Sequence, residues 1–199
     1  IKRMVADTYQ SVSGAGGGAM ANLRGQSEKL LDADSLTSKS GEGQIAYNVV
    51  PQIDRFLESG YTFEEQKMKQ ESQKILHAPE MQISATCVRV PVYISHSASV
   101  HIEFTRPMTV EEATELLKAM PGITVLDNPA DYPMPWDVAG EDDVFIGRIR
   151  QDMSHPSGLV LWIVSDNLRK GAALNSLQIA EELVSRGRLK PKNISGVTS

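Results

Sequence analysis

The 199-residue chain has a single cysteine, Cys87, and no run of about 18 apolar residues. One cysteine cannot form an internal disulfide, which favours a reducing, cytoplasmic setting. The lack of a long apolar run argues against a transmembrane helix, and residues 1–6 lack the apolar core of a signal peptide. Four scattered histidines and one thiol have no metal-ligand spacing, so the sequence predicts no metal site.

The chain also has fewer positively charged residues than negatively charged ones. Lys and Arg total 20 against 25 Asp and Glu, so the formal net charge is −5. This balance argues against nucleic acid or an anionic membrane as the main partner. The hydrophobic fraction of 41% is ordinary for a chain that buries a core. The first residue is Ile1 rather than Met, which predicts a piece of a longer polypeptide or a processed mature form.

The most informative stretch is Cys87-Val-Arg-Val-Pro-Val-Tyr-Ile-Ser-His-Ser97. Apolar residues alternate from 88 to 94, which predicts a half-buried strand. In an unbroken strand Arg89 and His96 would face opposite ways. Pro91 favours an edge or a bulge, and a bulge or bend before His96 would bring the two side chains to one side. A guanidinium that clamps a carboxylate beside an imidazole is a plausible acid/base site. The alternative is a strand with an exposed arginine and a satisfied histidine.

A glycine-rich turn spans residues 10–18 and is too rich in glycine for a helix interior. Such a turn lets backbone N–H groups approach a phosphate or a ring. It has neither the phosphate-loop pattern nor a full dinucleotide fingerprint, so a flexible loop is the alternative.

Residues 62–76 form a predicted helix that begins with a capping box of Thr62 and Glu65. Glu64 and Lys67 lie one turn apart on one charged face of this helix. By itself this spacing predicts a solvated face with ion pairs.

The hydrophobic pattern predicts an α+β fold. Residues 158–164 are apolar at both parities, which predicts a central strand covered on both faces. The expected strands are 1–9, 88–94, 99–104, 123–126, 144–150 and 158–164, and the expected helices are 19–31, 62–76, 109–120 and 166–186. The helix at 109–120 should begin with a second capping box, and residues 32–43 and 128–135 should be surface loops.

Five blocks of the chain resemble aspartate-semialdehyde dehydrogenase. They are Thr8-Tyr-Gln-Ser-Val-Ser-Gly-Ala-Gly16, Ala46-Tyr-Asn-Val-Val-Pro51, Glu64-Glu-Gln-Lys67 with the helix after it, the Cys87–Ser97 stretch, and Ser165-Asp-Asn-Leu-Arg-Lys-Gly-Ala-Ala173. They run in the order of the family and cover most of the chain. The resemblance implies a mixed, largely antiparallel sheet with helices on one face and a partner subunit on the other, as in the C-terminal domain of glyceraldehyde-3-phosphate dehydrogenase.

The resemblance also implies a domain division and an activity. Residues 1–165 would bind substrate and dimerise, 166–189 would be a C-terminal helix that packs on a cofactor-binding domain, and 190–199 would be a disordered tail. The implied reaction is the NADPH-dependent reductive dephosphorylation of L-aspartyl-4-phosphate to L-aspartate 4-semialdehyde, with release of phosphate. It leads to lysine, threonine, methionine and diaminopimelate, and the implied assembly is a cytoplasmic homodimer.

The family's residue roles map onto eight positions of this chain. His96 would be the general acid/base. Arg89 would bind the substrate carboxylate, Glu64 the amino group, Lys67 the phosphate, and Gln10 would position the acyl carbon. Ser13, Gly14 and Asn167 would contact the NADP cofactor.

Three departures from the family pattern limit what the chain is expected to do alone. The nucleophilic cysteine of the family lies before the Thr8–Gly16 block, and the cofactor loop lies earlier still, so neither is in this chain. Cys87 is expected to be a buried, inert thiol. Gly17-Gly18 stands where family members often carry a lysine. We therefore expect a catalytically incomplete part of the enzyme.

Two other functions compete with this interpretation. The chain could be a non-catalytic dimerisation module of the same fold. It could also belong to an N-acetyl-glutamyl-phosphate reductase. Glu64 argues against the second, because an acetylated nitrogen carries no charge for a carboxylate to hold.

Overall fold

The computed structural model describes residues 1–31 and 43–188. Most of the predicted loop at 32–43 and the whole predicted tail at 190–199 lie outside these residues. The elements in chain order are β1 (Arg3–Gln10), the 3-10 turn η1 (Val12–Ala15), α1 (Gly17–Leu31), α2 (Phe63–Ile75), β2 (Gln82–Arg89), β3 (His96–Glu103), α3 (Val110–Lys118), β4 (Ile123–Leu126), α4 (Pro135–Val138), β5 (Val144–Gln151), β6 (Gly158–Ser165), the π-helical turn η2 (Arg169–Ala173) and α5 (Leu174–Ser185).

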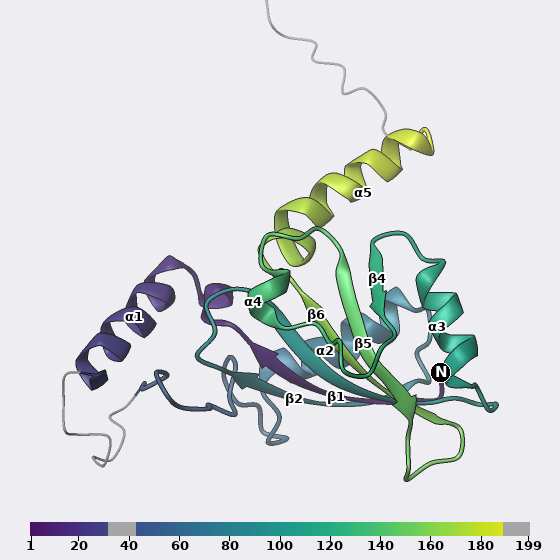
Figure 1. Cartoon of the computed structure of the whole chain (residues 1–199), viewed down its shortest axis with the longest axis horizontal. Helices are drawn as coiled ribbons and strands as arrows, with labels where there is room; N and C mark the ends of the chain where they lie inside the picture. The colour runs from purple at the N-terminus through teal and green to yellow at the C-terminus, as the bar shows by residue number, and fades with distance from the viewer. Residues whose placement is uncertain (32–42, 189–199) are drawn as a thin grey trace, which may run out of the picture.

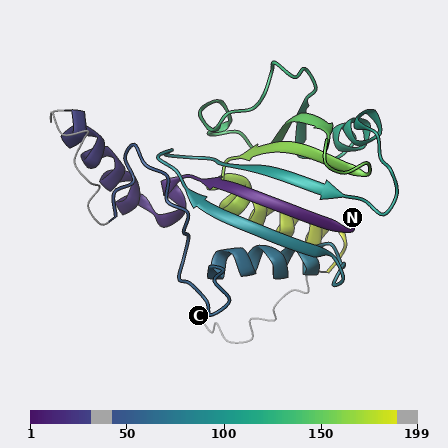
Figure 2. The same cartoon turned by 90° about the horizontal axis from the view of Figure 1, so that it is seen from below.

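The six strands form one mixed sheet in the order β2-β1-β3-β6-β5-β4 (Figure 1). The outer pairs β1–β2 and β4–β5 are parallel, and the three inner pairs are antiparallel. Helix α2 runs along the edge strand β2 (Figure 2), and α3 packs on β4 and β5 at the opposite edge. This confirms the predicted α+β fold with its mixed, largely antiparallel sheet.

Strand β6 lies between β3 and β5, as the two-sided apolar pattern predicts. Leu159, Val160 and Val164 are almost completely buried, although they alternate in direction along the strand. Burial on both faces gives the sheet a rigid centre from which the ends of the neighbouring strands are positioned.

The prediction of a strand at 88–94 was wrong. Strand β2 ends at Arg89, and residues 90–95 form a loop before β3 begins at His96. Pro91 has no N–H to offer a ladder, and the loop pairs with the turn after β1 instead. Val12 N donates to Val92 O at 2.8 Å, and Ser13 N donates to Tyr93 O at 3.1 Å.

The glycine-rich stretch is more regular than expected. Residues 12–15 form a 3-10 turn, and α1 begins at Gly17, two residues before its predicted start. Gly16, at φ +88°, makes the sharp change of direction between them. A small core of Val12, Leu23 and residues 45–46 then holds α1 against the chain.

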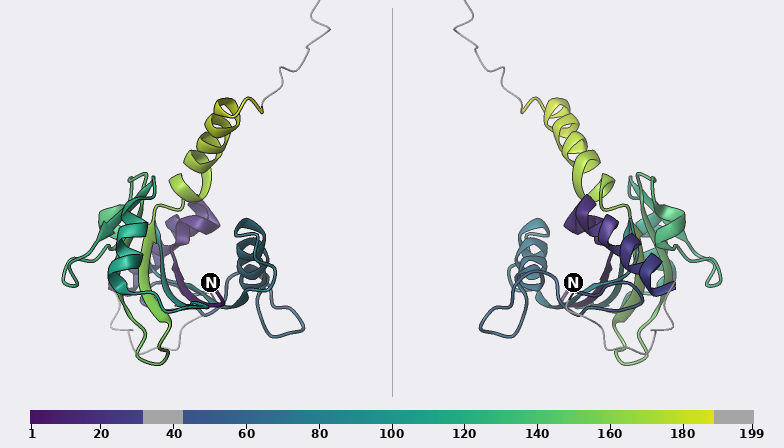
Figure 3. Two further views of the ribbon diagram at one scale, coloured as in Figure 1. Left: turned by 90° about the vertical axis from the view of Figure 1, so that its right-hand side faces the viewer. Right: turned by 90° about the vertical axis from the view of Figure 1, so that its left-hand side faces the viewer.

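The C-terminal helix also differs from its prediction. Residues 169–173 form a π-helical turn, and the α-helix begins only at Leu174. Helix α5 stands clear of the sheet (Figures 1 and 3), and none of its residues is buried. Its apolar residues Leu177, Ile179 and Leu183 are therefore exposed.

Candidate active site at the strand ends

Four strands end or begin at one rim of the sheet. In the register of the sheet Gln10 lies opposite Arg89 across the parallel pair, and His96 lies opposite Ser165 across the antiparallel pair. Helices α1 and α5 both leave the sheet at this rim (Figure 1). Residues far apart in the sequence therefore converge there, and all the predicted site residues on strands belong to this group.

Arg89 is held at this rim by its own backbone. Its N–H donates to Val50 O at 2.8 Å, and its carbonyl accepts from Val50 N at 3.0 Å. The guanidinium Nη1 donates to Ser11 O at 2.6 Å. Partial burial lowers the pKa of Arg89 from its ordinary value, while the charge of Glu64 opposes that shift. The remaining guanidinium donors are suited to a substrate carboxylate.

The imidazole of His96 is fixed by Ser11. The Ser11 backbone N–H donates to Nδ1 at 3.0 Å, and the Ser11 hydroxyl lies 3.0 Å from the same nitrogen. Because a backbone amide can only donate, Nδ1 is an acceptor and the neutral ring carries its proton on Nε2. Burial and the positive charge of Arg89 lower the pKa of His96 to about 4.

Gly14 faces both functional side chains. A Cβ on Gly14 would lie 3.2 Å from Arg89 Nη1 and 3.3 Å from His96 Nε2. The absence of a side chain thus leaves space directly between the guanidinium and the proton-bearing nitrogen. The predicted bend does occur, because Ser95, at φ +73°, turns the chain just before His96.

Asn167 lies behind the histidine. Its Oδ1 accepts from Ser11 Oγ at 3.2 Å, Ser13 Oγ at 3.1 Å and Ser95 N at 3.0 Å, and its Nδ2 donates to Ser13 Oγ at 3.0 Å. Ser13 and Asn167, both predicted to contact a cofactor, are thus bonded to each other. No sequence pattern predicted a role for Ser11 or Ser95. The indication that the sequence did contain is their position next to the predicted site residues Gln10 and His96.

Glu64 and Lys67 form an ion pair at 3.0 Å on the first turns of α2. Their hydrogen bond raises the pKa of Lys67. Glu64 is near enough for its charge to act on Arg89 and His96. The predicted capping box is present, and Glu65 is buried in it, with its second oxygen accepting from Cys87 N at 2.9 Å. Glu65 therefore joins the start of α2 to the end of β2.

Gln10 is buried and its amide donates to Thr8 Oγ1 at 3.3 Å. Cys87 is completely buried and its thiol contacts Met68 Sδ at 3.4 Å. Burial raises the pKa of Cys87 to about 11. A thiol with this pKa is almost entirely protonated at neutral pH, so Cys87 is unsuited to act as a nucleophile.

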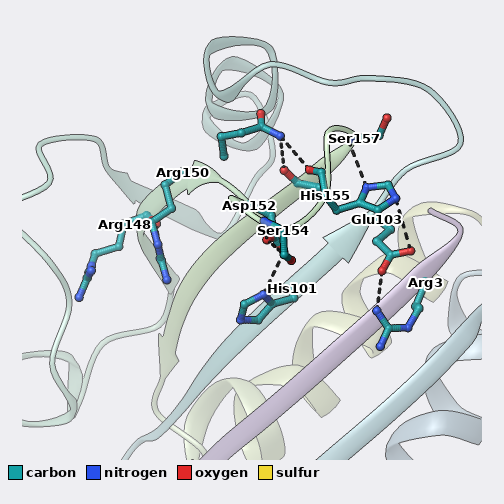
Figure 4. Close-up of polar contacts among 11 residues, drawn as sticks. Arg3, His101, Glu103, Arg148, Arg150, Asp152, Ser154, His155 and Ser157 are labelled. Atoms are coloured by element: carbon teal, nitrogen blue, oxygen red, sulfur yellow. Dashed lines mark hydrogen bonds and ion pairs between the residues drawn. The ribbon is translucent and has the colours of Figure 1, made fainter.

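A second polar cluster lies at the other end of β3 (Figure 4). His101 Nδ1 lies 3.1 Å from Asp152 Oδ2, and Arg3 pairs with Glu103 at 2.5 Å. Hydrogen bonds from Ser154 and His101 lower the pKa of Asp152 to about 2. This cluster ties the β5–β6 hairpin to β1 and β3, and it contains none of the predicted site residues.

Within residues 1–31 and 43–188, no group of three or more His, Cys, Asp or Glu side chains could hold a metal ion. In the same part of the chain, no helix is both long enough and apolar enough to cross a membrane.

Residues 1–170 match the family described as semialdehyde dehydrogenase, dimerisation domain. The chain belongs to the semialdehyde dehydrogenase family. It is 48% identical over 193 residues to aspartate-semialdehyde dehydrogenase of Bacillus subtilis, which covers 92% of this chain and 56% of the relative.

Solved structures of the family agree with the fold. Aspartate semialdehyde dehydrogenase II from Vibrio cholerae, complexed with ASA, matches with a TM-score of 0.86 and 46% identity, over 93% of this chain and 55% of that one. The Candida albicans aspartate semialdehyde dehydrogenase with NADP matches with a TM-score of 0.69 and 26% identity, over 95% and 52%. The chain spans about half the length of the relatives that it matches.

Proposed function

We propose that this chain is the substrate-binding and dimerisation part of an NADP-dependent aspartate-semialdehyde dehydrogenase. The reaction would be the reductive dephosphorylation of L-aspartyl-4-phosphate to L-aspartate 4-semialdehyde and phosphate. It would serve lysine, threonine, methionine and diaminopimelate biosynthesis in the cytoplasm. The observation that carries the proposal is that Arg89 Nη1 and His96 Nε2 both lie beside Gly14, 3.2 and 3.3 Å from the position that a Cβ would take.

The charged groups of the site match the charges of the proposed substrate. Arg89 supplies free guanidinium donors for the α-carboxylate. Glu64 supplies a carboxylate for the amino group, and Lys67, one turn along α2, supplies a cation for the phosphate. The ion pair that these two side chains make with each other would be exchanged for contacts with the substrate. Gln10, next to His96 at the strand ends, would position the acyl carbon.

The chemistry requires a thiolate that this chain does not provide, since the Cys87 thiol is buried and protonated. We propose that the nucleophile lies outside the 199 residues, in a longer parent enzyme. Its attack on the acyl phosphate forms a thioester while phosphate leaves with the C–O bond pair. The Nε2–H of the neutral His96 ring would donate a hydrogen bond to the carbonyl oxygen of the substrate as that oxygen becomes negatively charged.

NADP would supply the hydride that reduces the thioester. Glycines 16–18 fit the edge of such a cofactor, because they are exposed and a Cβ on any of them would meet nothing within 4 Å. A ring or phosphate could therefore come close to the backbone there. Ser13, Gly14 and Asn167 stay proposed cofactor contacts, although three donors already occupy Asn167 Oδ1.

We propose that the parent enzyme is a homodimer and that the side of the sheet bearing Tyr9 and Trp162 faces the second subunit. The two rings are 5.6 Å apart between centroids, and Tyr9, near the end of β1, is 38% exposed. The family match over a dimerisation domain supports this. A Tyr9→Glu change would place a charge in that contact and should shift the dimer toward monomer in analytical ultracentrifugation.

The test of the function uses the complete reading frame that contains these residues. NADPH formation from aspartate semialdehyde and phosphate is measured for the wild type, Arg89→Lys and the control Arg106→Lys. Arg89→Lys should lower kcat/KM by roughly 100-fold, since lysine loses the planar bidentate fork. Arg106, which pairs with Glu112 far from the site, should tolerate lysine.

Three results would reject the proposal. The first is equal activity of the two variants, and the second is a preference for N-acetyl-glutamyl semialdehyde over aspartate semialdehyde. The third is a reading frame that opens at Ile1 and gives a protein without turnover, which would favour the non-catalytic module. We expect the 199-residue chain alone to show no turnover.

A further inference from the structure

The first observation is a strained residue next to the proposed acid/base. Ser95 has φ +73° and is completely buried. A residue other than glycine in this conformation costs on the order of 1 kcal/mol and persists only where its surroundings hold it. The turn at Ser95 directs the chain from the loop after Pro91 into β3. It therefore determines the position of His96, the first residue of that strand.

The second observation is what holds Ser95. Its N–H donates to Asn167 Oδ1 at 3.0 Å, and the same oxygen accepts from the hydroxyl of Ser11. Ser11 in turn donates its backbone N–H to His96 Nδ1. The amide oxygen of Asn167 is thus linked to His96 in two ways. It accepts from Ser95, the residue before His96, and it accepts from Ser11, whose backbone N–H binds the His96 ring.

The third observation is that Asn167 is itself anchored. The neighbouring Asp166 is buried, and its Oδ1 accepts from Leu168 N at 2.8 Å while its Oδ2 accepts from Gly140 N at 2.8 Å. The turn that presents Asn167 directly follows β6, where Ser165 lies opposite His96 in the sheet. The position of the amide oxygen relative to the histidine is therefore fixed by the sheet.

We propose that Asn167 is a positioning residue for His96, in addition to any contact it makes with a cofactor. Its Oδ1 holds Ser95 in the left-handed conformation and Ser11 against Nδ1. The ring is thereby fixed with its proton on Nε2, beside Gly14. This inference rests on the proposed function for the meaning of His96, but the geometry that it concerns exists without substrate or cofactor.

The test uses nitrogen NMR of the histidine side chains in the purified 199-residue chain, with no cofactor in the sample. In the wild type His96 should show the tautomer protonated on Nε2. In Asn167→Ala the tautomers should mix, and hydrogen exchange of the Ser95 amide should accelerate at least ~10-fold because its acceptor is lost. The matched control is Asn175→Ala, an exposed asparagine on α5.

A double variant tests the route through Ser95. Glycine adopts φ +73° without strain, so Ser95→Gly should reduce the effect of Asn167→Ala on His96 in a double-mutant cycle. His101 and His155, remote from Asn167, report whether each variant is folded.

If Asn167→Ala does not fold, the Asn167→Asp variant tests whether Asn167 positions His96. A carboxylate two hydrogen bonds from the ring should raise the measured pKa of His96 by about one unit or more. A pKa that stays within ~0.3 units of the wild-type value would overturn the proposal.

If Asn167 only contacted the cofactor, the NMR spectra of His96 would respond differently to its substitution. His96 spectra would then be identical in the wild type and in Asn167→Ala, and this result would overturn the proposal. In the parent enzyme, positioning predicts a fall in kcat of ~10-fold or more, whereas a cofactor contact alone predicts a rise in KM for NADP. Because the NMR measurement needs no turnover, it can fail or succeed independently of the proposed reaction.

Discussion

His96 and His101 lie five residues apart on the same strand, β3, in contrasting surroundings. His96 is surrounded by fixed donors, namely the amide of Ser11 and the guanidinium of Arg89, and its pKa is lowered to about 4. His101 pairs with the carboxylate of Asp152 at the open edge of a hairpin. Burial and the nearby Arg89 guanidinium therefore oppose a positive charge on the His96 ring.

The contrast shows how a chemical role is assigned by neighbours rather than by residue type. At the site end, the Ser11 N–H donates to His96, and the Asn167 amide oxygen accepts from Ser11 and from Ser95. At the hairpin end, His101 pairs with Asp152, and the cluster joins strands to a turn (Figure 4). A ring that stays neutral with a proton on Nε2 is suited to donate a hydrogen bond to a developing negative charge, whereas a ring paired with a carboxylate is suited to hold a turn in place.

The largest expected effect separates the two histidines by activity. In the parent enzyme His96→Gln should lower kcat by roughly 100- to 10,000-fold, because glutamine cannot transfer a proton. His101→Gln should leave kcat within about twofold, since its side chain pairs with Asp152 at the other end of β3. Initial rates of NADPH formation measure both. Comparable losses of kcat in the two variants would contradict the assignment of different roles to the two histidines.

A smaller effect is expected at Gly14. The Cβ of Gly14→Ala would lie 3.2–3.3 Å from Arg89 Nη1 and His96 Nε2, so both groups must shift. We expect kcat/KM to fall ~10- to 100-fold from misplacement of the reacting groups. The control is Gly25→Ala in α1, where a Cβ meets nothing within 4 Å. That variant should keep full activity and gain up to about 1 kcal/mol in stability. An active Gly14→Ala would contradict this geometry.

The pH dependence of stability should carry the signature of His96. Its folded pKa, about 4, is below the unfolded value of about 6.5, so the unfolded chain binds more protons between these pH values. The free energy of unfolding should therefore fall by about 3 kcal/mol as pH drops from 6.5 to 4, and His96 should contribute nothing above that window. Urea unfolding of the wild type and His96→Gln tests this; parallel curves would refute it.

The smallest expected effect is at Asp152, in the other cluster. Its folded pKa, about 2, is below its ordinary value, so its contribution is complete above pH 4 and is lost as pH falls toward 2. Because Asp152 lies at a solvent-facing hairpin, its contribution to the free energy of unfolding is less than about 1 kcal/mol. Asp152→Asn should lower stability slightly at pH 7 and leave activity unchanged. A large loss of activity would mean that the hairpin end is coupled to the site.

Local patterns in the sequence were sufficient for several elements. The capping box of α2 formed as predicted, because Thr62 and Glu65 need only each other's backbone. At α3 the Thr109 hydroxyl does accept from Glu112 N, but Glu112 pairs with Arg106 in place of the reciprocal bond. The central position of β6 followed from its two-sided apolar pattern.

Alternation alone misplaced the boundaries of β2. The valines at 90 and 92 fit a strand pattern, yet their backbone groups bond to residues 10 and 12, because the turn after β1 lies beside this loop. The partner of a backbone group in such a loop is set by tertiary packing, which periodicity does not encode. The π-helical turn at 169–173 escaped prediction for a similar reason, since the sequence there reads as continuous helix.

The sequence by itself determined the fold class, the family resemblance and the residue types of the site, because these depend on periodicity, caps and motif order. Only the tertiary structure decided that Ser11 fixes His96 and that Asn167 holds Ser95. Those properties depend on distances and burial between segments as far apart as residues 11 and 167. They come into existence only when the sheet aligns the ends of its strands.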